Sequence, residues 1–263
     1  MSNVASLEGD VPISVVTVPC LSDNYAYLVH NDATGETALV DAPEARPILK
    51  ELSARKWQLD TILLTHHHAD HVMGVGELRR RFGSKVVGHH RDAHRLPRLD
   101  LAVSDGETIQ VCGRRFSVLD VSGHTVGHIA FITEGAAFTA DSLMALGCGK
   151  VFEGTFSMMW NSLQKLAKLP SDTLIFSGHE YTLSNARFAL SVEPANKALL
   201  ARVEEVKARR GAGLPTVPSE LSVELATNPF LRARLPEVKA LLGMSSASDS
   251  EVFGEVRTRK DRF

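Results

Sequence analysis

The sequence of 263 residues has little of several features that mark particular classes of protein. Its three cysteines, Cys20, Cys112 and Cys148, are an odd number without CxxC spacing, so a disulfide framework is not expected. No apolar run approaches the roughly 18 to 20 residues that a membrane-spanning helix needs. The first residues lack the basic start and apolar core of a signal peptide. We therefore expect a cytoplasmic protein with no membrane partner.

An excess of charge of one sign is also absent. Twenty-nine Lys and Arg against 31 Asp and Glu give a net charge of −2, too balanced for a protein whose main partner is nucleic acid. Hydrophobic residues make up 44% and charged residues 23%, as in an average soluble globular chain. A chain this long buries a sizeable core without disulfides, and its length predicts one or two domains.

Histidine, by contrast, is abundant and clustered. Four of the eleven histidines, His66, His67, His68 and His71, fall within six residues. An exposed polar loop resembling an expression tag is the alternative interpretation, but Asp70 and the flanking strand and helix patterns argue against it. Imidazole and carboxylate together suit zinc, iron or manganese better than calcium or magnesium. The cluster therefore predicts a metal site.

Short β-rich segments dominate up to about residue 180, separated by Gly, Asp, Asn and Ser. Strands are expected at Ile13–Pro19, Tyr25–His30, Thr37–Val40, Thr61–Leu64, Lys85–Val87, Arg115–Val121, His128–Thr133, Ala137–Thr139 and Thr173–Phe176. Helices are expected at Ala45–Ala54, Gly74–Phe82 and Phe156–Lys168. These strands are too numerous and too closely spaced for one alternating βαβ sheet. They predict an α+β fold of two sheets with helices on their outer faces.

The pattern changes after about Ser184. Leu199, Val203 and Val206 recur at helical spacing, and Pro236–Leu242 and Ser250–Lys260 predict two further short helices. We therefore expect a boundary near residues 180–185. It separates a metal-binding domain, residues 1–183, from a helical C-terminal domain, residues 184–263.

Three further candidate ligands each follow a predicted strand. His124 comes after Arg115–Val121, Asp141 after Ala137–Thr139, and His179 after Thr173–Phe176. A single histidine is more often a structural residue than a ligand. The repetition of one arrangement, a strand and then a ligand, favours a common metal site.

Several motifs resemble one known family. Thr65–His71, THHHADH, matches the THxHxDH motif of the metallo-β-lactamase superfamily, and within it the chain looks like a glyoxalase II, or hydroxyacylglutathione hydrolase. The match includes Asp23-Asn24-Tyr25, Gly147–Lys150, Phe152–Thr155, Gly178–Thr182, Asn228-Pro229-Phe230 and Arg257–Asp261. The resemblance implies an αββα sandwich followed by a small helical domain that contributes to substrate binding.

The resemblance also implies two divalent metal ions, expected to be zinc, with iron or manganese as alternatives. The first would be held by His66, His68 and His124, the second by Asp70, His71 and His179, and Asp141 would bridge them. Two bridged metals can supply hydroxide near neutral pH, and Asp70 could also orient that hydroxide. His67 points away from its neighbours in an extended segment, so we expect it, like His128, to be structural.

The implied substrate is a glutathione thioester, S-D-lactoylglutathione, hydrolysed to glutathione and D-lactate in the second step of methylglyoxal detoxification. Arg257, Lys260 and Lys150 would bind its glycine carboxylate, with Tyr181 and Phe152 as further contacts. Phe152 stands where many relatives carry Tyr, so a hydroxyl contact is missing there. Ala140-Asp141-Ser142 departs from the commoner Gly-Asp-Thr without changing the ligand. We expect a monomer.

Three alternatives remain open from sequence. A single-iron persulfide dioxygenase shares the HxHxDH loop but lacks the helical C-terminal segment and its motifs. A nuclease of the same superfamily is disfavoured by the balanced charge and by the lack of a long basic insertion. A metal-dependent binding module without catalysis would be expected to lack a ligand, and all seven are present.

Overall fold

The computed structural model describes residues 3–263, which form two compact units. The first unit contains residues 3–120 and 127–138, and the second contains residues 121–126 and 139–263. The chain passes from the first unit into the second within strand β11 (Ala136–Ala140). Over the described residues, every helix is too short or too polar to cross a bilayer.

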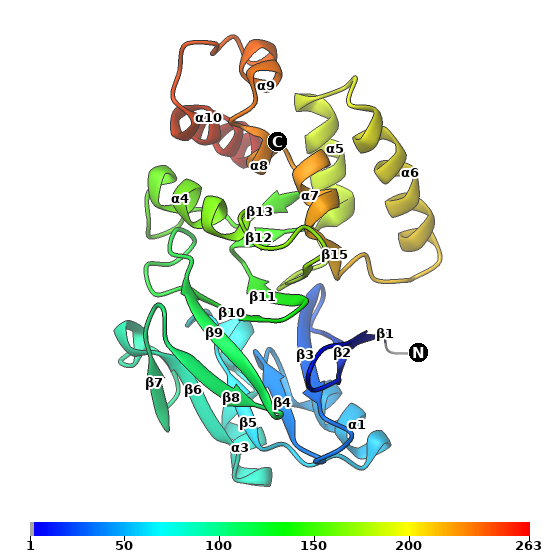
Figure 1. Ribbon diagram of the computed structural model, residues 1–263, viewed down its shortest axis with the longest axis vertical. Helices are drawn as coiled ribbons and strands as arrows, with labels where there is room; N and C mark the ends of the chain where they lie inside the picture. Colours follow the sequence, from blue (N-terminus) through cyan, green and yellow to red (C-terminus); the bar gives the residue numbers. More distant parts are fainter. Residues whose placement is uncertain (1–2) are drawn as a thin grey trace. The chain divides into compact units, whose positions relative to one another are not determined.

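A seven-stranded mixed sheet is the centre of the first unit (Figure 1). Its strands run in chain order: β1 (Asn3–Leu7), β2 (Ile13–Cys20), β3 (Asn24–His30), β4 (Thr37–Val40), β5 (Thr61–Leu63), β6 (Lys85–His89) and β7 (Leu101–Val103). The pairs from β1 to β4 are antiparallel and those from β4 to β7 are parallel. Parallel strands end at the same edge, so the residues after β4 and β5 are neighbours there.

Two helices, α1 (Ala45–Arg55) and α3 (Val75–Phe82), cover one face of this sheet (Figure 1). Ile48 and Leu52 of α1 pack with Leu28 and Ile62 of the sheet in one buried cluster. Burying each such side chain contributes roughly 1.5–3 kcal/mol. This packing fixes α1 and α3 against the strands whose ends carry the histidine loop. That loop contains the short helix α2 (Ala69–Val72), and the 3₁₀ turn η1 (His90–Asp92) follows β6.

The other face of the sheet packs on a second layer of strands. Within the first unit these are β8 (Thr108–Val111), β9 (Arg114–Asp120), β10 (Ile129–Thr133) and the start of β11, antiparallel and in that order. Phe138 meets Phe116 at 6.2 Å and Tyr27 of the first sheet at 5.8 Å between ring centroids. Aromatic rings therefore fill part of the core between the two layers of strands.

The second unit is mainly helical. It contains the strand pairs β12 (Leu143–Met144) with β13 (Gly147–Cys148) and β14 (Leu174–Ser177) with β15 (Ser219–Glu220). Its helices are α4 (Phe156–Leu166), α5 (Thr182–Val192), α6 (Lys197–Gly211), α7 (Leu221–Thr227), α8 (Pro229–Arg232), α9 (Pro236–Leu241) and α10 (Asp249–Arg262). Helices α5 and α6 pack through Ala186, Ala189, Leu199 and Val203. Ser248 and Glu251 form a capping box that begins α10.

The expected α+β fold of two sheets and helices, with a helical C-terminal region, is confirmed. All nine expected strands are present within one or two residues of their expected bounds. The sequence patterns did not identify β1, β7, β8 or helix α5, among others. The two compact units divide the chain at other residues than the expected domains, 1–183 and 184–263, and that domain division stays a prediction.

Candidate metal centre

The histidine loop of the first unit begins where β5 ends. Strand β5 is buried between parallel neighbours β4 and β6, and the chain then turns through His66, His67 and His68 into α2, which carries Asp70 and His71. The ring of His66 lies 4.8 Å from that of His68 and 4.2 Å from that of His71, between centroids. The loop therefore gathers the imidazoles that the sequence predicts as ligands.

Asp41, which directly follows β4, orients this loop. One carboxylate oxygen accepts the backbone N–H of Thr65 at 2.9 Å, and the other accepts the Thr65 hydroxyl and lies 2.8 Å from Nδ1 of His71. Asp41 has a left-handed φ of 56° and is 2% exposed. Since the carboxylate can only accept, Nδ1 of His71 carries the proton, and Nε2 is the nitrogen that could bind a metal. Asp41 is not among the site residues predicted from sequence.

Asp70 is held by the Asp23-Asn24-Tyr25 motif. The side-chain amide of Asn24 donates to both the backbone oxygen and Oδ2 of Asp70, each at 3.0 Å. The same Oδ2 lies 3.7 Å from Nε2 of His71. Asn24 therefore directs the Asp70 carboxylate toward the His71 nitrogen that can bind a metal.

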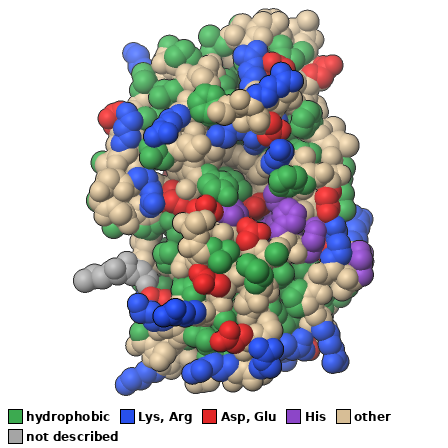
Figure 2. Space-filling view, turned by 180° about the vertical axis from the view of Figure 1, so that it is seen from behind, with side chains coloured by type: hydrophobic (Ala, Val, Ile, Leu, Met, Phe, Trp, Pro, Cys, Tyr) green, Lys and Arg blue, Asp and Glu red, His purple; other side chains and the backbone are tan. Residues whose placement is uncertain are grey.

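The two histidines expected to be structural are buried or half-buried in the first unit. His128 is fully buried and stacks on His66, with 4.6 Å between ring centroids and 15° between planes. Nδ1 of His67 lies 3.2 Å from the buried carboxylate of Asp92. Histidine side chains gather in one area of the face shown in Figure 2, next to acidic side chains.

The second unit brings together the other three predicted ligands. Nε2 of His124 lies 3.4 Å from Oδ2 of Asp141, and Nε2 of His179 lies 3.3 Å from the same oxygen. All three are nearly buried, at 4–5% exposure. The backbone after β11 and after β14 places Asp141 and His179 side by side, because Gly178 N–H donates to the carbonyl of Ala140 at 2.9 Å.

The donor chemistry of this group fits a cation. Nδ1 of His124 lies 2.7 Å from the backbone oxygen of Lys150 and must donate to it, since a carbonyl only accepts. In the neutral ring, Nε2 then presents a lone pair to the carboxylate of Asp141. A positive ion between a lone pair and a carboxylate oxygen turns a repulsive contact into ligation. Residue 149 packs closely against Asp141 and must be glycine, because a Cβ there would lie 2.0 Å from the backbone oxygen of Asp141.

Three of the predicted substrate contacts lie beside these ligands in the second unit. The Tyr181 ring stacks on His179 at 4.7 Å and 8°, and is 40% exposed. Phe152 lies 5.3 Å from the His124 ring and is 61% exposed. Nζ of Lys150 lies over the Phe152 ring at 5.5 Å. Two exposed aromatic rings and an ammonium group are thus available to a ligand next to His124 and His179.

Arg257 and Lys260 of α10 differ in their surroundings. Arg257 is 5% exposed; its Nη1 donates to the backbone oxygen of Cys148 at 2.9 Å, and Nε and Nη2 pair with Asp261. The anion beside Arg257 in the structure is therefore Asp261. Nζ of Lys260 lies 3.5 Å from the Ser184 hydroxyl, and burial, then the nearby Arg257 charge, lowers the pKa of Lys260. Burial raises the pKa of the Cys148 thiol to about 11.

The comparisons with known proteins agree with these motifs. Residues 22–179 match the model of the metallo-β-lactamase superfamily, and residues 180–263 match the model of the hydroxyacylglutathione hydrolase C-terminus. Hydroxyacylglutathione hydrolases of Ruegeria pomeroyi and Roseobacter denitrificans are 62% and 58% identical over 255 residues, which cover 96% of this chain and all of each relative.

Among solved structures, ETHE1 from Myxococcus xanthus has the same fold, with a TM-score of 0.64 at 22% identity over 98% of both chains. The identity of 58–62% to the two hydroxyacylglutathione hydrolases goes beyond a shared fold. So do the two family matches, which together span residues 22–263. The chain belongs to the hydroxyacylglutathione hydrolases, the glyoxalase II family, of the metallo-β-lactamase superfamily.

Proposed function

We propose that the protein hydrolyses S-(2-hydroxyacyl)glutathione, S-D-lactoylglutathione above all, with two divalent metal ions held by seven side chains. One observation carries this proposal: Nε2 atoms of two histidines, His124 and His179, face the same oxygen of Asp141. A carboxylate oxygen that faces two imidazole nitrogens could serve as a ligand shared by two cations. Zinc suits this nitrogen and oxygen donor set, with iron or manganese as alternatives.

The first unit would supply the remaining ligands. His66 and His68 would complete the metal held by His124, while Asp70 and His71 would complete the metal held by His179. Bound metals supply hydroxide near neutral pH and stabilise charge on a carbonyl oxygen. Asp41 keeps the proton of His71 on Nδ1, and Asn24 holds the Asp70 carboxylate, from where Asp70 would also orient the attacking oxygen.

Substrate selection would come from the second unit. Tyr181 and Phe152 offer exposed rings beside the ligands, and Lys150 and Lys260 offer ammonium groups for the glycine carboxylate. The guanidinium of Arg257 is bonded to Cys148 and Asp261, so it would support the binding of an anion mainly through its positive charge. Phe152 packs on the substrate without the hydroxyl of the commoner Tyr.

A persulfide dioxygenase is the second candidate, and the match of residues 180–263 to the hydroxyacylglutathione hydrolase C-terminus disfavours it. The test combines elemental analysis with two assays. The purified protein should contain two metals per chain and hydrolyse S-lactoylglutathione much faster than a lactoyl thioester that lacks glutathione. Oxygen consumption with a glutathione persulfide, together with one iron per chain, would favour the dioxygenase instead.

A further inference from the structure

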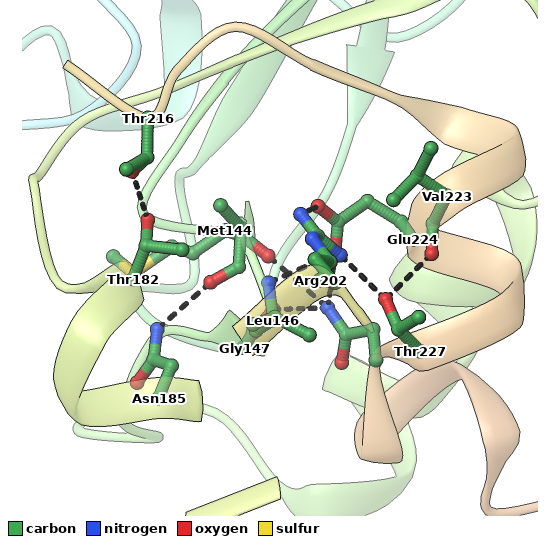
Figure 3. A network of polar contacts seen from close by, with 12 residues as sticks. Met144, Leu146, Gly147, Thr182, Asn185, Arg202, Thr216, Val223, Glu224 and Thr227 are labelled. Carbon is green, nitrogen blue, oxygen red and sulfur yellow. Dashed lines mark hydrogen bonds and ion pairs between the residues drawn. The ribbon is translucent and has the colours of Figure 1, made fainter. Parts of the chain in front are cut away.

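The turn at residues 144–148, which joins β12 to β13, is held by side chains from later in the chain. Its Leu146 has a left-handed φ of 57°, a conformation that disfavours any residue with a Cβ. Five consecutive residues each bond a side chain through the backbone, and Figure 3 shows Met144, Leu146 and Gly147 among them. Met144 and Gly147 accept from Asn228, Ala145 from Asn185 and Cys148 from Arg257, while Leu146 N–H donates to Glu224.

Glu224 of α7 is the centre of this arrangement. Its side chain is fully buried. One oxygen accepts Leu146 N–H at 2.9 Å and the Asn228 amide at 3.0 Å, and the other accepts from Arg202. Arg202 is itself 7% exposed and donates to the Thr227 hydroxyl. A buried carboxylate with this many donors is expensive to disturb, because each lost partner leaves a charged or polar group without solvent.

The turn leads directly to residues beside the metal ligands. Cys148 pairs with Leu143, and Gly149 N–H donates to the Ser142 backbone oxygen at 3.1 Å. The next residue, Lys150, accepts the Nδ1 proton of His124 on its backbone oxygen. A displacement of the turn therefore moves both the carbonyl that orients His124 and the ammonium group of Lys150.

We propose that Glu224 is a positioning residue of the hydrolase: it holds the 144–148 turn and thereby sets the place of Lys150 and the orientation of His124. This inference rests on the proposed function for the roles of Lys150 and His124. It also assigns a task to the Asn228-Pro229-Phe230 motif. Asn228 binds the turn with its amide nitrogen, while its oxygen caps α8 by accepting Phe230 N–H.

Two isosteric changes perturb the turn from different sides. In Glu224→Gln, the NH₂ group of the new amide must face either Arg202 or the Leu146 N–H, so that one donor faces another. In Asn228→Asp, the α8 cap is kept but the donor to Met144 and Gly147 is lost. Combining both changes restores one donor–acceptor pair between positions 224 and 228 without restoring the bonds to the turn.

A matched control comes from the same helical segment. Glu193 is 3% exposed and pairs with Arg232, so Glu193→Gln weakens a comparable buried ion pair. Each variant is purified with metal bound. Three quantities are measured: the melting temperature, kcat and KM for S-lactoylglutathione well below that temperature, and hydrogen exchange of the amides of residues 143–150.

Both single variants should lose at least tenfold in kcat/KM, through a lower kcat and a higher KM, and their turn amides should exchange faster. The double variant should regain melting temperature but neither turn protection nor kcat/KM. Glu193→Gln should stay within twofold of wild type in kcat/KM. Should the single variants not accumulate as folded protein, the double variant carries the same comparison.

The proposal is overturned if faster exchange at the turn leaves kcat/KM within twofold, if exchange at the turn does not change, or if the double variant regains kcat/KM along with stability. Failure of the wild-type protein to hydrolyse the thioester would instead contradict the proposed function. In that case, exchange in the variants would still decide whether Glu224 holds the turn.

Discussion

The change Asp41→Asn tests whether a carboxylate outside the predicted ligand set governs metal binding through the ligand that it orients. The native carboxylate accepts from Thr65 twice and from Nδ1 of His71. An asparagine can keep its oxygen on Thr65 only by turning its NH₂ toward His71. Because that NH₂ donates, Nδ1 of His71 would have to become the acceptor, and the ring proton would move to Nε2. A protonated Nε2 cannot bind a metal.

The size of the effect follows from two separate losses. Removing such a supporting carboxylate costs about 10- to 100-fold in metal affinity, which is about 1.4 to 2.7 kcal/mol. Asp41 is also 2% exposed. The mispaired amide should therefore lower the free energy of unfolding of the metal-free protein by about 1–3 kcal/mol.

The assay is competition for zinc against a chelating dye, with urea unfolding of the metal-free protein measured in parallel. Asp92→Asn is the matched control. Asp92 is also buried, at 1% exposure, and lies 3.2 Å from Nδ1 of His67, which is not an assigned ligand. Both variants should lose stability, but only Asp41→Asn should bind the more weakly held zinc at least tenfold less tightly. Equal zinc affinity in Asp41→Asn and wild type would refute the assignment of His71 as a ligand through Nε2.

Further predictions test three other residues. Asp141→Ala should reduce turnover more than His66→Ala, because Asp141 would be shared by two metals. Elemental analysis that finds no more than one metal per chain in active wild-type protein would contradict the assignment of Asp141 as a bridging ligand. Lys260→Ala should raise KM for S-lactoylglutathione on the order of tenfold and change little for a thioester without the glycine carboxylate. Since burial and the Arg257 charge lower the pKa of Lys260, the wild-type KM should begin to rise, as the ammonium loses its proton, at a pH below lysine's usual range. Ala140→Gly should raise the melting temperature by up to about 4 °C. The φ of 42° at this position disfavours alanine by about 1–2 kcal/mol, and the added conformational freedom of glycine in the unfolded chain offsets only part of that gain. An unchanged or lower melting temperature would contradict this prediction.

The candidate ligands could be located from sequence because the histidine loop and each of His124, Asp141 and His179 follow a predicted strand; their role as ligands stays a prediction. Strand patterns are local, and the structure has β5, β11 and β14 where the residues indicated them. Asp41 shows the limit of this reasoning. It also follows a predicted strand, Thr37–Val40, but its partner His71 is 30 residues away. Only the parallel pairing of β4 with β5 brings the two together, and pairing cannot be obtained from the pattern of one chain.

The basic pair on the last helix shows a different limit. The spacing of Arg257 and Lys260 correctly indicates neighbours on α10. It does not indicate that Arg257 is buried against Asp261 and the backbone oxygen of Cys148, which is 109 residues away. A contact of that range depends on how α10 packs in the second unit. Local spacing therefore identified a charged pair without distinguishing a structural arginine from a ligand-binding one.

The 144–148 turn of this chain takes its hydrogen-bond partners from positions far along the sequence. An irregular buried turn leaves backbone N–H and C=O groups that must find partners. Its own residues, such as Ala145 and Leu146, offer no side chain that can serve. The partners come instead from residues 40 to 109 positions later, among them Asn185, Glu224 and Arg257. The conformation of the turn is thus specified by residues far along the chain. A substitution in the helical segment can therefore change the environment of His124 without touching it.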